Sequence, residues 1–217
     1  MKLTVMLCLA RSSRKPLLAP AKPVDPSSLF GRNFRILYKA NPGYYILNRD
    51  QYMWINSTGE NSKHYRYVTD IKIVRGLAGE GTISFERSTN YGVYVHSLIY
   101  YGKVWQCMLN RIYDGSSWLR EDASWIPRQG LADPYGLSFE SFKHSGYFMR
   151  PEDFKLKISP FKDTHSYRNE ATWYPLPVSK VLSESADNDE TLIANHLANG
   201  KEIPIAKELD HIPVKDK

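Results

Sequence analysis

The sequence predicts an all-β domain made of three similar units, with extended tails at both ends. Two observations support this prediction: the composition, and a motif that recurs along the middle of the chain. The 217 residues include 15 Tyr, 13 Gly and 13 Pro, a mixture that suits short strands joined by turns better than long helices. Charged residues make up 24% of the chain, which is typical of a soluble domain.

The recurring motif is a Gly-Leu-Ala triplet that is followed by Ser-Phe-Glu. In each copy the Phe lies nine residues after the Gly of the triplet, and another Gly lies seven residues after the Phe. These positions are Gly76, Phe85 and Gly92 in one unit and Gly130, Phe139 and Gly146 in the next. An earlier unit has Ile36 and Gly43 at the same seven-residue separation. Agreement at so many offsets indicates an internal repeat.

A second anchor lies near the end of each unit. Asp122–Trp125 aligns with Glu170–Trp173, and Val68–Ile71 occupies the same place in the first unit. The second unit is five residues longer than the first, because 38 residues separate its two marker glycines instead of 33. We expect this insertion to lie between Ile99 and Tyr113, as a loop or a hairpin.

Short segments with the apolar alternation of strands occur in every unit. They are Tyr44–Leu47, Ile71–Val74, Val93–Val95, Val104–Leu109 and Phe154–Ile158. One unit cannot bury its own apolar face, whereas three units can close into a barrel without exposed strand edges. The sequence therefore predicts a β-trefoil, in which Trp125, Trp173 and Ile71 take equivalent core positions.

The trefoil is expected to span residues 33–178, with repeats at about 33–81, 82–135 and 136–178. Residues 1–32 begin with a short apolar run next to basic residues, which is signal-like, and continue as a Pro-rich linker. This leaves a secreted and a cytoplasmic protein both open. Residues 179–217 are expected to be a polar tail that includes a short helix.

Composition and charge exclude several classes of partner and cofactor. The net charge is +6, but no run of Lys and Arg within the repeats resembles a nucleic-acid-binding stripe. No apolar stretch approaches the length of a membrane span. The two cysteines, Cys8 and Cys107, cannot form a disulfide framework, and we expect Cys107 to be a buried thiol. No spacing indicates a metal site, and no cofactor is expected.

The chain resembles AbfB, the arabinofuranose-binding module of fungal α-L-arabinofuranosidases. The resemblance rests on four ordered segments: Asp114–Ser116, Asp122–Trp125, Gly130–Ala132 and Ser138–Glu140. It covers about residues 33–178 and implies a β-trefoil with one sugar pocket in each repeat. In that family, an Asp in an Asp-Ala-Thr-Phe segment and a His after a Tyr-Leu-Arg segment hold the sugar. A carboxylate can accept hydrogen bonds from two hydroxyls, and an imidazole can donate one bond and accept another.

Carried over to this sequence, the resemblance places its best pocket in the second repeat. The acid there is Asp122, and Tyr94 lies at the pocket edge. His96 lies one position before the expected His, in a segment that the comparison shortens by one residue. The third repeat is altered, because its acid is Glu170 and Pro151 replaces the His.

The pocket of the first repeat is not expected to bind sugar, because Val68 replaces the acid and Asn48 replaces the His. No catalytic activity is expected of the chain. In the family, the glycosidase activity belongs to a separate domain, and glycoside hydrolysis needs two carboxylates that flank one bond, a pair that this sequence does not indicate.

The main hypothesis is a non-catalytic, lectin-like module that binds a glycan, either an arabinose-bearing polysaccharide or one with other sugar decorations. Two alternatives stay open. The chain could be a trefoil with decayed sugar pockets that binds a protein through its surface or its tails. It could also be a fragment of a larger arabinofuranosidase.

Overall fold

The structure is a computed structural model that describes residues 24–57, 69–113 and 117–178. This part of the chain consists mainly of strands and turns. Its helical elements are short: the 3-10 helix η1 (Ser27–Leu29), α2 (Ser117–Asp122) and α3 (His165–Glu170). The predicted leader and the predicted C-terminal tail with its helix lie outside the described residues.

Each repeat contributes four strands in the same order, and the second repeat contains two more. The first repeat has β1 (Asn33–Tyr38), β2 (Tyr44–Arg49), β3 (Tyr52–Ser57) and β4 (Ile71–Arg75). The second has β5 (Ile83–Arg87), β6 (Val93–His96), β7 (Ile99–Tyr100), β8 (Lys103–Val104), β9 (Met108–Arg111) and β10 (Trp125–Gln129). The third has β11 (Leu137–Ser141), β12 (Tyr147–Glu152), β13 (Lys155–Pro160) and β14 (Trp173–Pro177).

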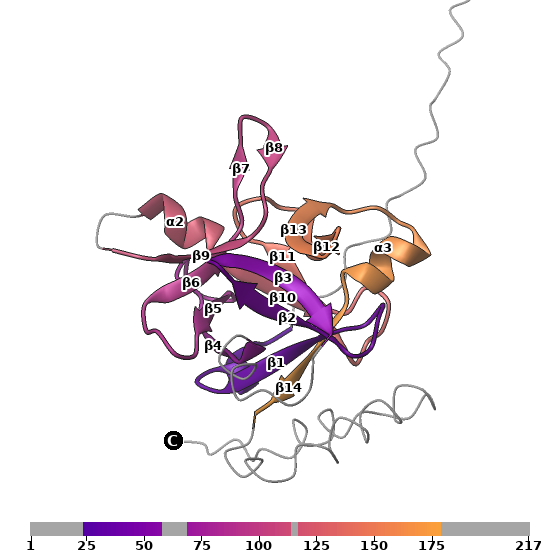
Figure 1. Ribbon diagram of the computed structural model, residues 1–217, viewed down its shortest axis with the longest axis horizontal. Coiled ribbons are helices and arrows are strands. Elements are labelled where there is room, and N and C mark those ends of the chain that lie inside the picture. Colours follow the sequence, from indigo (N-terminus) through magenta and orange to yellow (C-terminus); the bar gives the residue numbers. More distant parts are fainter. Residues whose placement is uncertain (1–23, 58–68, 114–116, 179–217) are drawn as a thin grey trace, which may run out of the picture.

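The first and last strands of the three repeats close into a barrel (Figure 1). β1 pairs with β4, β4 with β5, β5 with β10, β10 with β11, β11 with β14, and β14 returns to β1. The remaining strands of the repeats form the hairpins β2–β3, β6–β9 and β12–β13. This arrangement is a β-trefoil, so the predicted fold is confirmed.

The three hairpins join through one equivalent residue from each repeat. The Met53 N–H donates to the Cys107 carbonyl at 2.8 Å, and the Cys107 N–H donates to the Leu156 carbonyl at 2.7 Å. All three side chains are buried. Burial raises the pKa of the Cys107 thiol to about 12, so this side chain packs as a small apolar group, as the sequence predicts.

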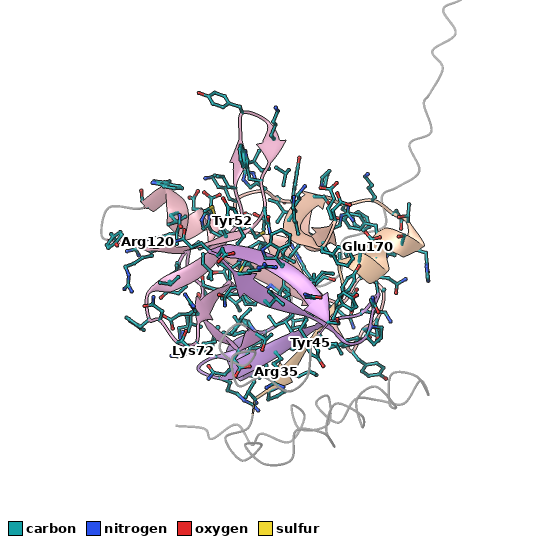
Figure 2. The ribbon with its side chains drawn as sticks, viewed as in Figure 1. Arg35, Tyr45, Tyr52, Lys72, Arg120 and Glu170 are labelled. Atoms are coloured by element: carbon teal, nitrogen blue, oxygen red, sulfur yellow. The ribbon has the colours of Figure 1, made fainter. Side chains whose placement is uncertain are left out.

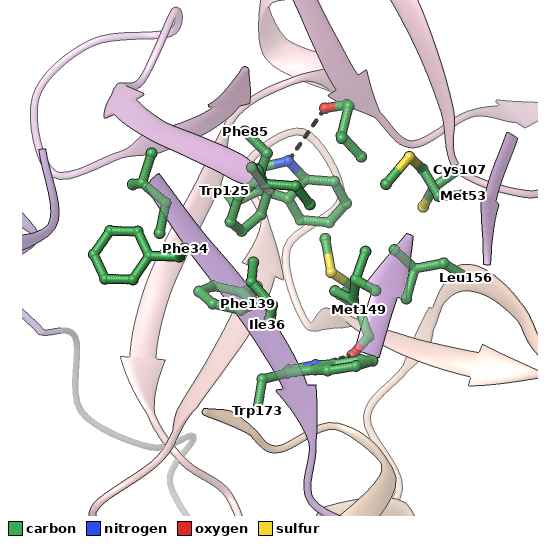
Figure 3. Close-up of a cluster of buried hydrophobic side chains, with 14 of the residues drawn as sticks. Phe34, Ile36, Met53, Phe85, Cys107, Trp125, Phe139, Met149, Leu156 and Trp173 are labelled. Atoms are coloured by element: carbon green, nitrogen blue, oxygen red, sulfur yellow. Dashed lines mark hydrogen bonds between the residues drawn. The ribbon is translucent and has the colours of Figure 1, made fainter. Parts of the chain in front are cut away.

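The predicted core positions are confirmed. Trp125 and Trp173 are fully buried, and Ile71 is 4% exposed. Each indole also donates a hydrogen bond to a hairpin strand, Trp125 Nε1 to the Val95 carbonyl at 3.4 Å and Trp173 Nε1 to the Met149 carbonyl at 3.1 Å (Figure 3). The indoles therefore tie the barrel to the hairpins in the second and third repeats.

The glycine of each marker turn is required by its backbone geometry. Gly92 and Gly146 both have φ of 80°, a left-handed conformation that favours glycine. Their N–H groups donate to the motif acids, Gly92 to Glu86 Oε1 at 2.9 Å and Gly146 to Glu140 Oε1 at 2.6 Å. The spacing of Phe, Glu and Gly in the motif thus reflects the same turn bond in the second and third repeats.

A buried hydroxyl explains the link between the Gly-Leu-Ala triplet and the distant acid segment. Ser84 Oγ accepts from the Leu77 N–H at 3.2 Å and donates to the Ala123 carbonyl at 2.8 Å. The third repeat makes the same two bonds with Ser138, Leu131 and Ala171. In both repeats, the anchored carbonyl belongs to the residue directly after the predicted pocket acid.

The predicted insertion in the second repeat is a hairpin. β7 and β8 pair with each other, with Ile99 opposite Val104, and they project away from the barrel (Figure 1). Tyr101, in the turn between them, is 86% exposed. The insertion therefore adds surface without altering the barrel.

Replacing Trp125 by Ala is expected to lower the free energy of unfolding by about 3–5 kcal/mol, because the change leaves a cavity in the core. Trp118→Ala is the matched control, because Trp118 is 55% exposed on α2, and we expect it to change stability by less than about 0.5 kcal/mol. Chemical denaturation of both variants measures the difference. Equal losses would contradict the core position of Trp125.

Candidate functional site

Asp122 lies at the centre of a polar cluster at the end of α2. Its side chain is only 1% exposed. Lys143 Nζ donates to Asp122 Oδ2 at 2.8 Å, and His144 Nε2 lies 3.8 Å from Asp122 Oδ1. Lys143 and His144 belong to the turn between β11 and β12, so this site combines residues of two repeats. Together with His96, these side chains are called the second-repeat cluster below.

His96 ends β6 and is 2% exposed. Its Nδ1 lies 3.3 Å from the Ser97 carbonyl oxygen. Since a carbonyl oxygen only accepts, this bond places the proton of the neutral ring on Nδ1 and leaves Nε2 as an acceptor. The pKa of His96 is lowered, and burial is the main cause. Ser97 and Asp122 oppose this shift, whereas Lys143 adds to it.

Two atoms of the second-repeat cluster are buried without a hydrogen-bond partner, Asp122 Oδ1 and His96 Nε2. In the described residues, the other side-chain atoms in this state are Trp54 Nε1 and Arg87 Nε. A buried polar group without a partner costs about 1–3 kcal/mol, so such groups are uncommon and call for an explanation. Both atoms are acceptors, so what each of them lacks is a hydrogen-bond donor.

The cluster is electrically balanced at neutral pH. The charges of Asp122 and Lys143 cancel, and burial lowers the pKa of His144 as well as that of His96. Lys143 and His144 are its more accessible members, with 33% and 23% of their side chains exposed. The two unpaired acceptors, Asp122 Oδ1 and His96 Nε2, are themselves shielded from solvent.

Tyr94 precedes His96 by two positions on β6, but its hydroxyl is engaged elsewhere. Burial raises the pKa of Tyr94 to about 12, and the Glu86 carboxylate contributes in the same direction. Tyr91 and Arg120 are the other groups that act on the Tyr94 hydroxyl. The structure thus brings Asp122 and His96 together, and directs the Tyr94 hydroxyl to Glu86.

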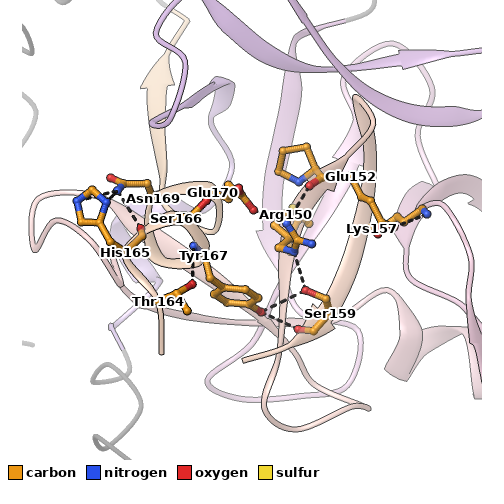
Figure 4. Close-up of polar contacts among 12 residues, drawn as sticks. Arg150, Glu152, Lys157, Ser159, Thr164, His165, Ser166, Tyr167, Asn169 and Glu170 are labelled. Carbon is orange, nitrogen blue, oxygen red and sulfur yellow. Dashed lines mark hydrogen bonds and ion pairs between the residues drawn. The ribbon is translucent and has the colours of Figure 1, made fainter. Parts of the chain in front are cut away.

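In the third repeat, the acid already has internal partners. Glu170 ends α3, and it accepts from Arg150 Nη1 on one oxygen and from Ser166 Oγ on the other at 2.8 Å (Figure 4). Arg150 is also held by Ser159 Oγ at 2.8 Å and lies over the Tyr167 ring. Figure 2 shows Glu170 on the opposite side of the molecule from Arg120, which lies on α2 together with Asp122. Asp122 and Glu170 therefore belong to separate sites.

The structure corrects the alignment around His96. The core indole donates to the residue directly before His96 in β6 and to the residue directly before Arg150 in β12. His96 therefore takes the position of Arg150, and Ser97 takes the position of Pro151. The equivalent indole bonds thus align β6 with β12 without a gap, and the one-residue shortening expected at His96 is wrong.

The first-repeat site is only partly visible. Asn48 lies on β2, is 8% exposed, and pairs across the hairpin with Met53. Val68, which stands in place of the acid, lies outside the described residues.

Lys143 and His144 were not identified from the sequence. They lie in the repeat that follows the acid, and equivalent turn bonds put Ala40 and Thr89 at the position of Lys143 in the other repeats. The repeat pattern carries no signal for a residue that occurs only once. Only the contact across the repeat boundary shows that these side chains belong to the site.

Comparison with known proteins identifies the module. The family model described as alpha-L-arabinofuranosidase B (ABFB) domain, AbfB, matches residues 108–193, which include Asp122, Lys143 and Glu170. The chain contains an AbfB-family module. A probable alpha-L-arabinofuranosidase B of Aspergillus terreus is 40% identical over 60 residues, which are 28% of this chain and 12% of that protein.

Solved structures share the fold of the AbfB module. An arabinofuranosidase complexed with arabinofuranosyl-alpha-1,2-xylobiose superposes with a TM-score of 0.60 at 20% identity, over 71% of this chain and 32% of that one. The BEL beta-trefoil superposes with a TM-score of 0.53 at 15% identity, over 73% of this chain and 99% of that one. The match thus spans about a third of the arabinofuranosidase and nearly all of the single trefoil.

Two further features of the AbfB module concern membranes and metals. Within residues 24–57, 69–113 and 117–178, no helix has the length and apolar character needed to cross a membrane. The same part of the chain holds no group of three or more His, Cys, Asp or Glu side chains placed to bind a metal ion.

Acidification is expected to destabilise the module through its buried histidine. The pKa of His96 is lowered from 6.5 in the folded state, so the unfolded chain binds more protons and stability falls as the pH drops below about 6.5. His96→Gln should reduce this loss by up to about 1.4 kcal/mol per pH unit. Denaturation curves between about pH 8 and pH 5 measure the slope. An unchanged slope in the variant would contradict the burial of a neutral His96.

Proposed function

We propose that the chain acts as a non-catalytic carbohydrate-binding module that holds one sugar at the second-repeat cluster. The observation that carries this proposal is the pair of buried acceptors without partners, Asp122 Oδ1 and His96 Nε2. A sugar offers several hydroxyl donors on adjacent carbon atoms, so one ring can satisfy both acceptors. The membership in the AbfB family supports a sugar as the occupant.

The charge of the cluster favours a neutral sugar. Asp122 and Lys143 already form an ion pair at 2.8 Å, so an anionic group would compete with a buried carboxylate for the same ammonium. The Lys143 ammonium has two N–H groups left for a ring oxygen or a glycosidic oxygen of a neutral sugar. A terminal arabinofuranose side chain, or a similar decorated unit, meets these requirements.

A ligand has to reach the acceptors past Lys143. Its side chain is flexible and one third exposed, so its stem can move while the ammonium stays close to the buried Asp122 carboxylate. The third-repeat site differs in this respect, since Arg150 and Ser166 already occupy both oxygens of Glu170. We therefore assign sugar binding to the second repeat and a structural role to the third.

The affinity of one such site is expected to be low. A single sugar ring makes few contacts, which corresponds to a Kd of about 1 mM, or roughly −4 kcal/mol. Useful binding then requires ligands with clustered side chains or more than one copy of the module.

Replacing Asp122 by Asn is expected to weaken sugar binding at least about tenfold, or about 1.4 kcal/mol, because the stronger charge-assisted bond is lost. The full chain is screened on affinity gels and glycan arrays that carry arabinan, arabinoxylan and animal-type glycans. Glu170→Gln is the matched control, and it should leave the affinity unchanged. Circular dichroism establishes that both variants fold. Equal affinity of wild type and Asp122→Asn would rule out the second-repeat cluster.

A protein-binding role is the second candidate, and exposed aromatic residues favour it. Tyr52, Trp105 and Phe154 are 43%, 51% and 58% exposed. They come from three different repeats and lie within two positions of the hydrogen-bonded residues that join the hairpins. Exposed aromatic clusters of this kind often mark protein interfaces. Absence of binding to every glycan by the folded chain would favour this role over the sugar site.

A further inference from the structure

The Asp122 carboxylate interacts with two imidazole rings from different repeats. His144 Nε2 lies 3.8 Å from Asp122 Oδ1, and Asp122 also acts electrostatically on His96. The same oxygen lacks a hydrogen bond. Asp122 Oδ1 is therefore the atom for which a ligand hydroxyl and a protonated histidine would compete.

The protonation state of His96 decides what this site can accept. With the proton on Nδ1 and the Ser97 carbonyl as its partner, Nε2 offers a lone pair to a hydroxyl donor. Adding a proton to Nε2 turns this acceptor into a charged donor. The ring then repels the hydroxyl hydrogen that it had accepted, and it gains a direct attraction to Asp122.

We propose that the second-repeat cluster releases its sugar on acidification, because protonated His96 and His144 replace the sugar hydroxyl at Asp122 Oδ1 with an internal ion pair. This inference rests on the proposed sugar binding and adds its regulation. Two histidines from neighbouring repeats act on one carboxylate, so the response belongs to the assembled trefoil and not to a single repeat.

The groups around the two rings set the pH range of this response. Burial and Lys143 hold the pKa of both histidines down, whereas Asp122 raises the pKa of both, and the Ser97 carbonyl raises that of His96. Both rings are therefore neutral at pH 7, where the site binds, and take up protons only in the acidic range. The sugar stabilises the neutral rings, so bound sugar lowers both pKa values further by linkage.

The first test measures the Kd of the full chain for methyl α-L-arabinofuranoside by calorimetry between about pH 8 and pH 5. Below the titration midpoint, we expect the affinity to fall about tenfold per pH unit for each proton taken up. His144→Gln, which keeps both acceptors and removes one of the two titrating rings, should show a shallower dependence on pH, whereas Glu170→Gln should follow the wild type. Binding of the wild type that stays constant with pH would overturn the inference and leave the proposed function intact.

A second test does not depend on any ligand. Nitrogen-15 NMR of the histidines in the full chain should show His96 with Nδ1 protonated and Nε2 bare at neutral pH. Asp122→Asn should lower the titration midpoints of His96 and His144, because it removes the anion that favours their charged forms. A proton on Nε2 at neutral pH, or midpoints that do not respond to Asp122→Asn, would overturn the inference even if no sugar binds.

Discussion

The buried Ser84 hydroxyl and its counterpart Ser138 fix the geometry on which the rest of the molecule depends. Each hydroxyl accepts from a turn N–H and donates to the carbonyl that follows the acid of its repeat, at 2.8 Å to Ala123 and 2.6 Å to Ala171. Both serines are fully buried, so water cannot replace these bonds. The end of each short helix is therefore held against the barrel, and the acid at that end has a defined direction.

The same frame supports two chemically different sites. In the third repeat, an arginine on β12 neutralises Glu170, and the network around it is closed by Ser159 and Ser166. In the second repeat, an imidazole takes the place of that arginine, and a lysine from the next repeat supplies the counter-charge. The exchange of arginine for histidine, together with a lysine from the next repeat, thus separates a self-satisfied ion pair from a cluster with unused acceptors.

The unpaired acceptors of the second-repeat cluster lower the stability of the fold. A buried carboxylate oxygen and a buried imidazole nitrogen without partners each cost about 1–3 kcal/mol, and the closed third-repeat network shows that the fold can avoid this loss. Departures from complete hydrogen bonding tend to coincide with functional sites. Asp122 and His96 are held in place without a ligand, so these two acceptors need little reorganisation on binding.

The sequence by itself determined the repeat, the fold and the core. The spacing of Gly76, Phe85 and Gly92 reports local geometry, namely a glycine turn and a buried ring, and such geometry is encoded within one repeat. The sequence also selected Asp122, whose position follows from the repeat and from the family resemblance, and it selected His96 one residue before the position of the family's His. The expected one-residue shortening at His96 was wrong, because residue spacing alone does not show which carbonyl accepts from a core indole. In the structure that carbonyl belongs to Val95, the residue before His96.

Only the tertiary structure decided which acid has partners and which lacks them. Lys143 lies 21 residues from Asp122 in the chain, in a different repeat, and reaches it because β10 and β11 pair along five residues. Within the third repeat, Arg150 on β12 reaches Glu170 at the end of α3 across 20 residues. Such contacts depend on barrel closure and on side-chain direction, and neither is encoded in local spacing. The physical reason is that hydrogen-bond satisfaction belongs to the packed molecule as a whole and to no single segment of it.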